Sequence, residues 1–224
     1  MKIAAISDIH GNLPKMPSAD VTVMAGDFSP LRAQRNIPQM YSWTKKEFIP
    51  WIKSLDTELF IFCAGNHDFV CEDSEWKYRF FDMANAAGLG STVMYLENEE
   101  AMVDGYRFFG CPYSDIPGWA FSTCRSGNEM AYKEIPYNTD VLIVHQAPKY
   151  SNIGTSNIGS WNERNFGSAK LFEEIQAKQP KHVVCGHIHS GNHEILNDGI
   201  TAYHNVSYLN EAYEPTYEPY TFII

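Results

Sequence analysis

Five short apolar runs in this chain each lead into polar residues of the types that bind metal ions. Apolar runs of this length, bounded by Gly, Asn or Asp, are typical of buried strands. The runs and the residues that follow them are 3–6 before Asp8 and His10, 21–25 before Asp27, 59–64 before Asn66, His67 and Asp68, 141–144 before His145, and 182–185 before His187 and His189. In open α/β sheets, ligands bind beyond the carboxyl ends of the strands. The pattern therefore predicts an α/β fold in which five strand ends bring carboxylates, an amide and histidines to a single rim.

The residue types at these strand ends define the metal chemistry. A mixed set of carboxylate, amide and imidazole groups suits manganese, iron or zinc better than copper or calcium. Asp8 and His10 are two residues apart, so the loop after their strand allows both to hold one ion. Asp27 is the natural bridge, because the two oxygens of a carboxylate can hold two cations about 3.5 to 4 Å apart. A water between two such ions becomes hydroxide near neutral pH, which predicts a dinuclear centre with a hydroxide nucleophile.

The individual motifs differ in specificity. Asp-x-His and Gly-Asp are common, and a lone histidine at a strand end, such as His145, is more often a core residue than a ligand. The segments 65–68 (Gly-Asn-His-Asp) and 186–189 (Gly-His-Ile-His) are much rarer by composition. All five motifs in one order, each after an apolar run, argue against chance. Three further histidines are assigned structural roles, because His182 begins a predicted strand and His193 and His204 have no motif around them.

Length and cysteine content bound the class of protein. At 224 residues the chain can bury a large core, and we expect one domain over 1–224 because the ligand runs span nearly its whole length. Five scattered cysteines without a C-x-x-C pair do not resemble a secreted disulfide framework. No apolar stretch approaches the roughly 20 residues of a membrane helix, and the first apolar run reaches Asp8 too soon for a signal peptide. We therefore expect a cytoplasmic protein without a membrane partner.

The charge argues against nucleic acid as a partner. The formal charge is −10 with neutral histidines, and two divalent cations would offset only about four of these charges. The remainder repels a phosphate backbone, and no basic stripe counters it. We expect no stable nucleic-acid complex and disfavour a DNA nuclease.

The spacing of apolar residues, together with the positions of capping residues, Pro and Gly, predicts the remaining elements. Helices are predicted over 37–55, interrupted at Pro50, over 74–87, capped by Asp73 or Ser74 and stopped at Gly88, and over 168–178. Further strands are predicted at 94–96, in a hairpin over 101–109 that turns at Asp104-Gly105, and in a hairpin over 194–203. The Tyr-Glu-Pro repeats at 213–215 and 217–219 predict an extended strip lying on the domain.

In this order, the ligand motifs resemble those of the calcineurin-like metallophosphoesterase superfamily. The resemblance implies a four-layer αββα sandwich of two mixed sheets with flanking helices. It implies that Asp8, His10 and His189 hold one metal, that Asn66, His145 and His187 hold the other, and that Asp27 is shared. It further implies that His67 stabilises the phosphoryl group or protonates the leaving oxygen, and that Asp68 orients His67.

Later segments look like one branch, the metallophosphoesterase-domain-containing group. They are 104–113, 119–121, 180–190, 198–199 and 205–207, and the likeness runs from about residue 93 to the end. Some members of that group carry Gly where His187 stands, which weakens metal binding, so the histidine here implies a competent centre. The branch suggests phosphodiesters, with 2′,3′- or 3′,5′-cyclic nucleotides as candidate substrates.

Substrate contacts are less constrained than the metal ligands. Asp27 is followed by Phe28-Ser29-Pro30 and not by the Arg-Gly continuation of the phosphoprotein phosphatases, which argues against that subfamily. Tyr113, Trp119 and Phe121 are candidates for stacking a base, with ordinary packing as the equal alternative. Candidate phosphate or specificity contacts are Arg32, Lys149, Arg164 and Asn165.

The sequence, with the resemblance, predicts that this chain is a phosphodiesterase that acts on a small-molecule phosphoester through a metal-bound hydroxide. It would use two ions of manganese, iron or zinc, with manganese supporting activity in vitro. The alternatives are a phosphomonoesterase of the same fold and a non-catalytic metal-binding scaffold. Oligomeric state is left open.

Overall fold

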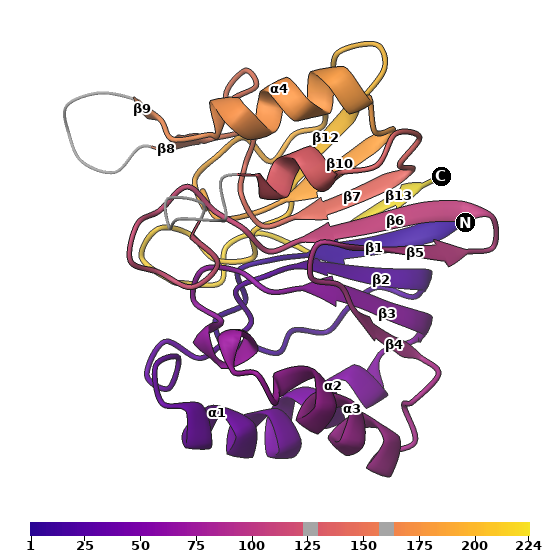
Figure 1. Ribbon diagram of the computed structural model, residues 1–224, viewed down its shortest axis with the longest axis vertical. Coiled ribbons are helices and arrows are strands. Elements are labelled where there is room, and N and C mark those ends of the chain that lie inside the picture. The colour runs from indigo at the N-terminus through magenta and orange to yellow at the C-terminus, as the bar shows by residue number, and fades with distance from the viewer. Residues whose placement is uncertain (123–129, 157–163) are drawn as a thin grey trace.

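Two β-sheets face each other in this protein, and helices cover the outer face of each sheet (Figure 1). The computed structural model describes residues 1–122, 130–156 and 164–224. The first sheet has the spatial order β13 (Tyr220–Ile223), β1 (Lys2–Ile6), β2 (Ala19–Ala25), β3 (Thr57–Cys63) and β4 (Val93–Tyr95). The second has the order β11 (Leu196–Asn197), β12 (Ala202–Asn205), β10 (His182–Cys185), β7 (Val141–Val144), β6 (Tyr106–Cys111) and β5 (Glu99–Val103). A separate two-stranded sheet joins β8 (Thr155–Ser156) to β9 (Arg164–Asn165).

Both large sheets are mixed. Strands β1 to β4 are parallel, and β13 runs antiparallel to β1 with Lys2 opposite Ile223. In the second sheet β6, β7, β10 and β12 are parallel, and antiparallel β5 and β11 form its edges. The N-terminal amine donates to the carbonyl of Ile224 at 3.0 Å, so the two ends of the chain lie side by side (Figure 1). The predicted αββα sandwich is confirmed.

Three apolar layers hold the sandwich together, and the strands contribute to them by alternation. On β1, Ile3 and Ala5 face the other sheet, while Ala4 and Ile6 face the helices. On the second sheet, Ile143 lies in the layer between the sheets, with neighbouring strand residues packing under the outer helix. Strands buried on both faces read as continuous apolar runs, which is why five of them were recognisable from the sequence.

The helices occupy the predicted segments with different boundaries. Under the first sheet lie α1 (Ile37–Trp43), the π-helical η1 (Thr44–Phe48), α2 (Ile49–Ser54) and α3 (Trp76–Ala86), and over the second lies α4 (Ala169–Lys178) (Figure 1). Short 3₁₀ turns are η2 (Phe69–Glu72) and η3 (Ala131–Glu134). The wider π turn precedes Pro50, whose missing N–H and bulky ring disfavour a regular α-helical ladder.

The N-terminal cap of α3 and the turn between β5 and β6 had both been predicted from the sequence. The cap of α3 was predicted wrongly, because Glu75 occupies that position without a side-chain cap, and Asp73 instead accepts from the Glu75 N–H at 2.9 Å. The turn between β5 and β6 is confirmed, with positive φ at both Asp104 and Gly105. Strand β13 was not predicted.

The strand ends that carry the ligand motifs do not form the single rim that the sequence predicts. Strands β1, β2 and β3 belong to one sheet, while β7 and β10 belong to the other, so the functional loops come from two adjacent rims. Backbone hydrogen bonds join the loops within each rim: Asp8 donates to Gly26 at 3.1 Å, and Gly186 donates to His145 at 3.1 Å. In the described ranges, no helix combines the length and apolarity needed to span a membrane. The single domain over 1–224 stays a prediction.

Candidate metal centre

Four of the predicted metal ligands have a left-handed backbone conformation. The φ angles are 53° at Asp8, 41° at His10, 54° at Asp27 and 68° at His187. Side chains other than glycine rarely adopt this region, and each such residue costs of order 1–3 kcal/mol. The loops are held there by neighbouring backbone, for example by the His10 N–H, which donates to the Asp27 carbonyl at 3.0 Å. With this conformation, Asp8, His10 and Asp27 place their ligand atoms in overlapping buried clusters.

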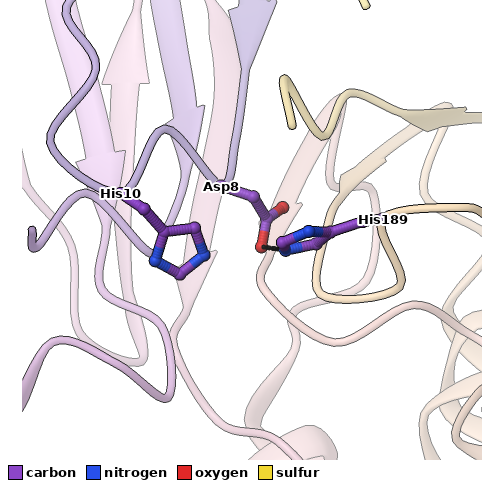
Figure 2. Close-up of side chains that lie close together, drawn as sticks. All are labelled: Asp8, His10 and His189. Atoms are coloured by element: carbon purple, nitrogen blue, oxygen red, sulfur yellow. Dashed lines mark ion pairs between the residues drawn. The ribbon is translucent and has the colours of Figure 1, made fainter. Parts of the chain in front are cut away.

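Asp8, His10 and His189 converge from the ends of β1 and β10 (Figure 2). His189 Nε2 lies 3.2 Å from Asp8 Oδ1, and the Ser207 hydroxyl donates to Asp8 Oδ2 at 2.8 Å. His189 Nδ1 donates to the Asn210 carbonyl at 2.9 Å, which directs Nε2 toward Asp8. Burial opposes charge on both groups, but their pairing outweighs it. It holds the pKa of Asp8 below its ordinary value and raises the pKa of His189 to about 9.

Asp27 lies at the centre of the cluster. Its Oδ2 is 3.4 Å from Nε2 of His145, 3.7 Å from Nε2 of His10 and 3.9 Å from Nε2 of His67. Its Oδ1 accepts the backbone N–H of His67 at 2.8 Å. Burial favours the protonated acid, but the surrounding imidazoles, His145 first, hold the pKa of Asp27 well below its usual range. One carboxylate oxygen thus faces imidazoles from three different strand ends, as a shared ligand would.

His145 and Asn66 form the other side of the cluster. His145 is fully buried, its Nδ1 donates to the Ala25 carbonyl at 2.9 Å, and its Nε2 is 2.7 Å from Asn66 Oδ1. Burial would lower the pKa of His145, yet the nearby Asp27 raises it to about 9. The His187 ring lies 5.0 Å from the His145 ring, and its backbone N–H donates to the Asp8 carboxylate at 3.0 Å.

The donor set fits metal ions. Candidate ligand atoms fall into three overlapping groups, each within 4.8 Å: Asp8, His10 and His189; His10, Asp27 and His67; and Asp8, Asp27 and His145. Both ring nitrogens of His10 are buried and have no hydrogen-bond partner among the described residues. Such atoms are rare in proteins, and a cation would satisfy one of them. Carboxylate and imidazole donors in this arrangement suit divalent transition metals.

His67 is a buried member of the cluster and lies beside an aromatic ring. Its Nδ1 contacts the side-chain oxygen of Gln34, and its ring lies 4.4 Å from the ring of Trp119. Burial lowers the pKa of His67, an effect that outweighs the opposing charge of Asp27. Gln34 therefore takes the orienting position beside this histidine.

Asp68 does not orient His67, so that prediction was wrong. Its carboxylate accepts backbone N–H groups of Asp27 at 2.8 Å, Ser29 at 2.9 Å and Gly65 at 2.8 Å. Burial, reinforced by the charge of Asp27, raises the pKa of Asp68 to about 7. Asp68 thus joins the loops after β2 and β3, and acts on the site through the backbone.

The predicted substrate contacts are distributed unevenly around the cluster. Trp119 lies against His67, and Arg32 lines a cavity of about 310 Å³ that His10 also borders. Tyr113 lines a different cavity of about 460 Å³, which none of the predicted metal ligands borders. The amide of Asn165 is bonded within its own loop, donating to the Ser151 carbonyl at 2.8 Å and accepting from the Gly167 N–H at 2.9 Å.

A second cavity of about 310 Å³ opens beside His187. Its lining is largely apolar and includes the acidic side chains of Asp115 and Glu211. The other lining residues are Ile116, Pro117, Gln146, Ser156, Phe166, His187 and Ile188. Cavities therefore border both His10 and His187, at the two sides of the cluster.

Several residues near the cluster were not predicted. Gln34 contacts His67, Ser207 donates to Asp8, the Asn210 carbonyl fixes His189, and the Tyr213 ring lies 5.0 Å from that of His10. None of these residues directly follows an apolar run. Only the Tyr-Glu-Pro repeat marked the segment around Tyr213 as unusual.

Known proteins are similar to this chain in sequence and in fold. A family model described as calcineurin-like phosphoesterase matches residues 1–191. Metallophosphoesterase domain-containing protein 1 of Homo sapiens is 30% identical over 239 residues, which cover 97% of this chain and 69% of that protein. A UPF0046 protein of Caenorhabditis elegans is 28% identical over 241 residues, covering 100% of this chain and 81% of that protein.

Two solved structures show the same fold at low identity. TT1561 of Thermus thermophilus has a TM-score of 0.59 at 13% identity, covering 91% of this chain and 88% of that one. Phosphopantetheinyl hydrolase of Mycobacterium tuberculosis has a TM-score of 0.54 at 14% identity, covering 92% of this chain and 88% of that one.

Proposed function

Because the chain belongs to the calcineurin-like phosphoesterase family, we propose that it is a dinuclear-metal-dependent phosphodiesterase. The membership confirms the resemblance seen in the sequence, and the family generally binds two divalent metal ions. The observation that carries the proposal is the position of Asp27, whose Oδ2 is faced by three imidazoles at 3.4 to 3.9 Å. Small phosphodiesters, including cyclic nucleotides, are the proposed substrates.

Each of the two proposed ions has ligands from both rims. Asp8, His10 and His189 would hold one ion, and Asn66, His145 and His187 the other, with Asp27 between them. When bound, the ions would offset the charge on the phosphoryl oxygens and supply a water of lowered pKa. Manganese, iron and zinc all suit this donor set.

His67 is the proposed acid for the leaving oxygen. With the Gln34 oxygen as acceptor, Nδ1 of His67 carries a hydrogen, which leaves Nε2 to exchange a proton with substrate. The lowered pKa makes protonated His67 a stronger acid than free histidine. Trp119 lies against this ring and partly shields it from water.

The charges around the cluster favour a diester over a monoester. Among the described residues that line the two flanking cavities, Arg32 is the only Lys or Arg, while Asp115 and Glu211 are acidic. A phosphate monoester carries a charge of about −1.5 to −2 near pH 7, whereas a diester carries about −1. These two acidic side chains therefore repel a monoester more strongly than a diester, which supports the diester proposal.

The proposal is tested by hydrolysis of bis(p-nitrophenyl) phosphate against p-nitrophenyl phosphate with Mn²⁺ and an EDTA blank. We expect metal-dependent turnover with a higher kcat/KM for the diester. Preference for the monoester would move the assignment to a phosphomonoesterase of the same fold. No turnover by protein that holds two metals would favour the non-catalytic scaffold.

A further inference from the structure

Tyr213 lies against three histidines of the candidate metal centre. Its ring centroid is 5.0 Å from that of His10, 5.3 Å from that of His189 and 6.4 Å from that of His67. The planes are steeply inclined, at 83°, 86° and 68° respectively, so the contacts are edge-to-face. With 40% of its surface exposed, Tyr213 presents aromatic area to whatever approaches these histidines.

A specific turn holds Tyr213 in this position. Its N–H donates to the Asn210 carbonyl at 2.9 Å, and the Asn210 side chain accepts the N–H groups of Ala212 at 2.9 Å and Glu214 at 3.0 Å. Tyr213 itself has a φ of 60°, which is unusual for a bulky side chain. The turn therefore fixes the direction of the ring despite an unfavourable backbone conformation.

The segment that carries Tyr213 is fastened on both sides. Before it, the carboxylate of Glu211 accepts from the Ser190 hydroxyl at 2.8 Å and from the Ser190 N–H at 3.1 Å. After it, the Tyr217 ring stacks on His193 with 3.5 Å between centroids. Both anchors are close in sequence to His189, so the segment is tied to the loop after β10.

Tyr213 and Trp119 both contact His67. The Trp119 ring is 4.4 Å from the His67 ring and the Tyr213 ring is 6.4 Å from it, and the two aromatic residues come from distant parts of the chain. A leaving group whose oxygen receives a proton from His67 must lie next to that imidazole. It would therefore meet aromatic surface from these neighbours.

We propose that Tyr213 is a specificity-determining residue that contacts the leaving group and, with Trp119, favours groups that carry a flat ring over alkyl groups. The inference rests on the proposed function, because it takes His67 as the residue beside the leaving oxygen. Nucleosides and aryl groups belong to the favoured chemical class. Flat rings gain from stacked or edge-to-face contact with aromatic side chains, whereas a methyl group offers little area.

Binding of two non-hydrolysable ligands to the Mn²⁺-loaded protein tests the role without turnover. Phenylphosphonate and methylphosphonate share the metal-binding group and differ in the group that would contact Tyr213. We expect wild-type protein to prefer phenylphosphonate in calorimetric titrations. Tyr213→Leu should lower that preference by roughly 2- to 10-fold, the range of one aromatic contact, while Tyr213→Phe keeps most of it.

Two controls separate this role from a structural one. Tyr78→Leu replaces a tyrosine on α3 that is 78% exposed, and it should bind both ligands as wild type does. Metal content should be unchanged in Tyr213→Leu, because no proposed ligand is removed. Equal weakening of both ligands, loss of metal, or no phenyl preference in wild type would overturn the proposal. A Tyr213-dependent phenyl preference in protein that hydrolyses no phosphoester would refute the proposed function but retain this contact.

Discussion

Close approach at two glycines shapes the ligand loops. A Cβ atom on Gly65 would collide with the Asp27 carboxylate, and one on Gly186 would collide with the Asp8 carboxylate and the Ser7 hydroxyl. The carboxylates of Asp8 and Asp27, two residues with positive φ, therefore lie against residues that have no side chain. These two motif glycines are therefore needed for the space that they leave to the carboxylates.

Gly186→Ala should displace the Asp8 carboxylate and weaken metal binding. We expect less than the wild-type metal content and at least about a tenfold loss of kcat/KM, since a misplaced ligand raises the barrier. Elemental analysis and diester kinetics measure both effects. Gly90→Ala is the matched control, because the closest atom to its Cβ would be the end of the exposed Asn85 side chain, far from the proposed ligands. Equal metal content in Gly186→Ala and wild type would contradict this account.

His67→Ala should separate catalysis from metal binding. If His67 donates the proton, turnover should fall by about 10²- to 10⁴-fold while both metals remain. Because His67 Nε2 lies only 3.9 Å from Asp27, metal content must be measured on the same sample. A variant that loses metal would identify His67 as a ligand, and wild-type turnover would exclude it as the acid.

At the level of elements, the sequence was most informative where burial is two-sided. The runs that became β1, β2, β3, β7 and β10 were recognisable because both faces are covered. Strand β13 was not predicted because it pairs with β1, at the other end of the chain, and pairing over that separation leaves no local signal. The division of the ligand loops between two sheets was hidden for the same reason.

The directions in which side chains point could not be predicted from the sequence either. Asp68 follows His67 directly, yet it turns to the N–H groups of Asp27, Ser29 and Gly65. Motif order predicted which residues gather at the strand ends, but not which atoms they meet. Gln34 could not be found because no apolar run or motif precedes it.

A histidine pair beneath β13 should make stability depend on pH. The His204 ring lies 4.5 Å from the Phe222 ring, and its Nε2 is 3.2 Å from Nδ1 of His182. Burial, with a smaller contribution from His182, lowers the pKa of His204 from 6.5 to about 4. As pH falls through this window the unfolded chain takes up the proton first, so stability is lost between about pH 6.5 and 4.

His204→Phe should reduce that pH dependence. The substitution keeps a flat ring against Phe222 and removes the titrating group. Between pH 7.5 and 5, we expect the Tm of the variant to fall by at least about 2 °C less than that of wild type. Scanning calorimetry of both proteins checks this. Identical falls in Tm would show that His204 does not contribute.

For the whole molecule, metal binding should stabilise the sandwich. The proposed ligands come from both sheets, so ions bound between them would join the two rims. A ligand at 100 times its Kd stabilises a folded protein by about 2.7 kcal/mol, which corresponds to roughly 5–11 °C in Tm for a chain of this size.

Metal removal should therefore lower Tm by about that amount. Thermal unfolding with excess Mn²⁺ and with EDTA measures the difference. Asp27→Ala is the control, because its Tm should respond much less to either addition. If EDTA leaves the Tm unchanged in wild-type protein that is known to have held metal, the ions do not stabilise the protein by joining the two rims.

Metal stoichiometry decides whether the protein holds a two-metal centre that shares Asp27. Wild-type protein and Asp27→Ala would be loaded with Mn²⁺, desalted and analysed for metal per chain. We expect about two ions per chain in wild type and fewer than about one in the variant, because the shared ligand is lost. Two ions retained in Asp27→Ala, or a single ion in wild type, would contradict this expectation.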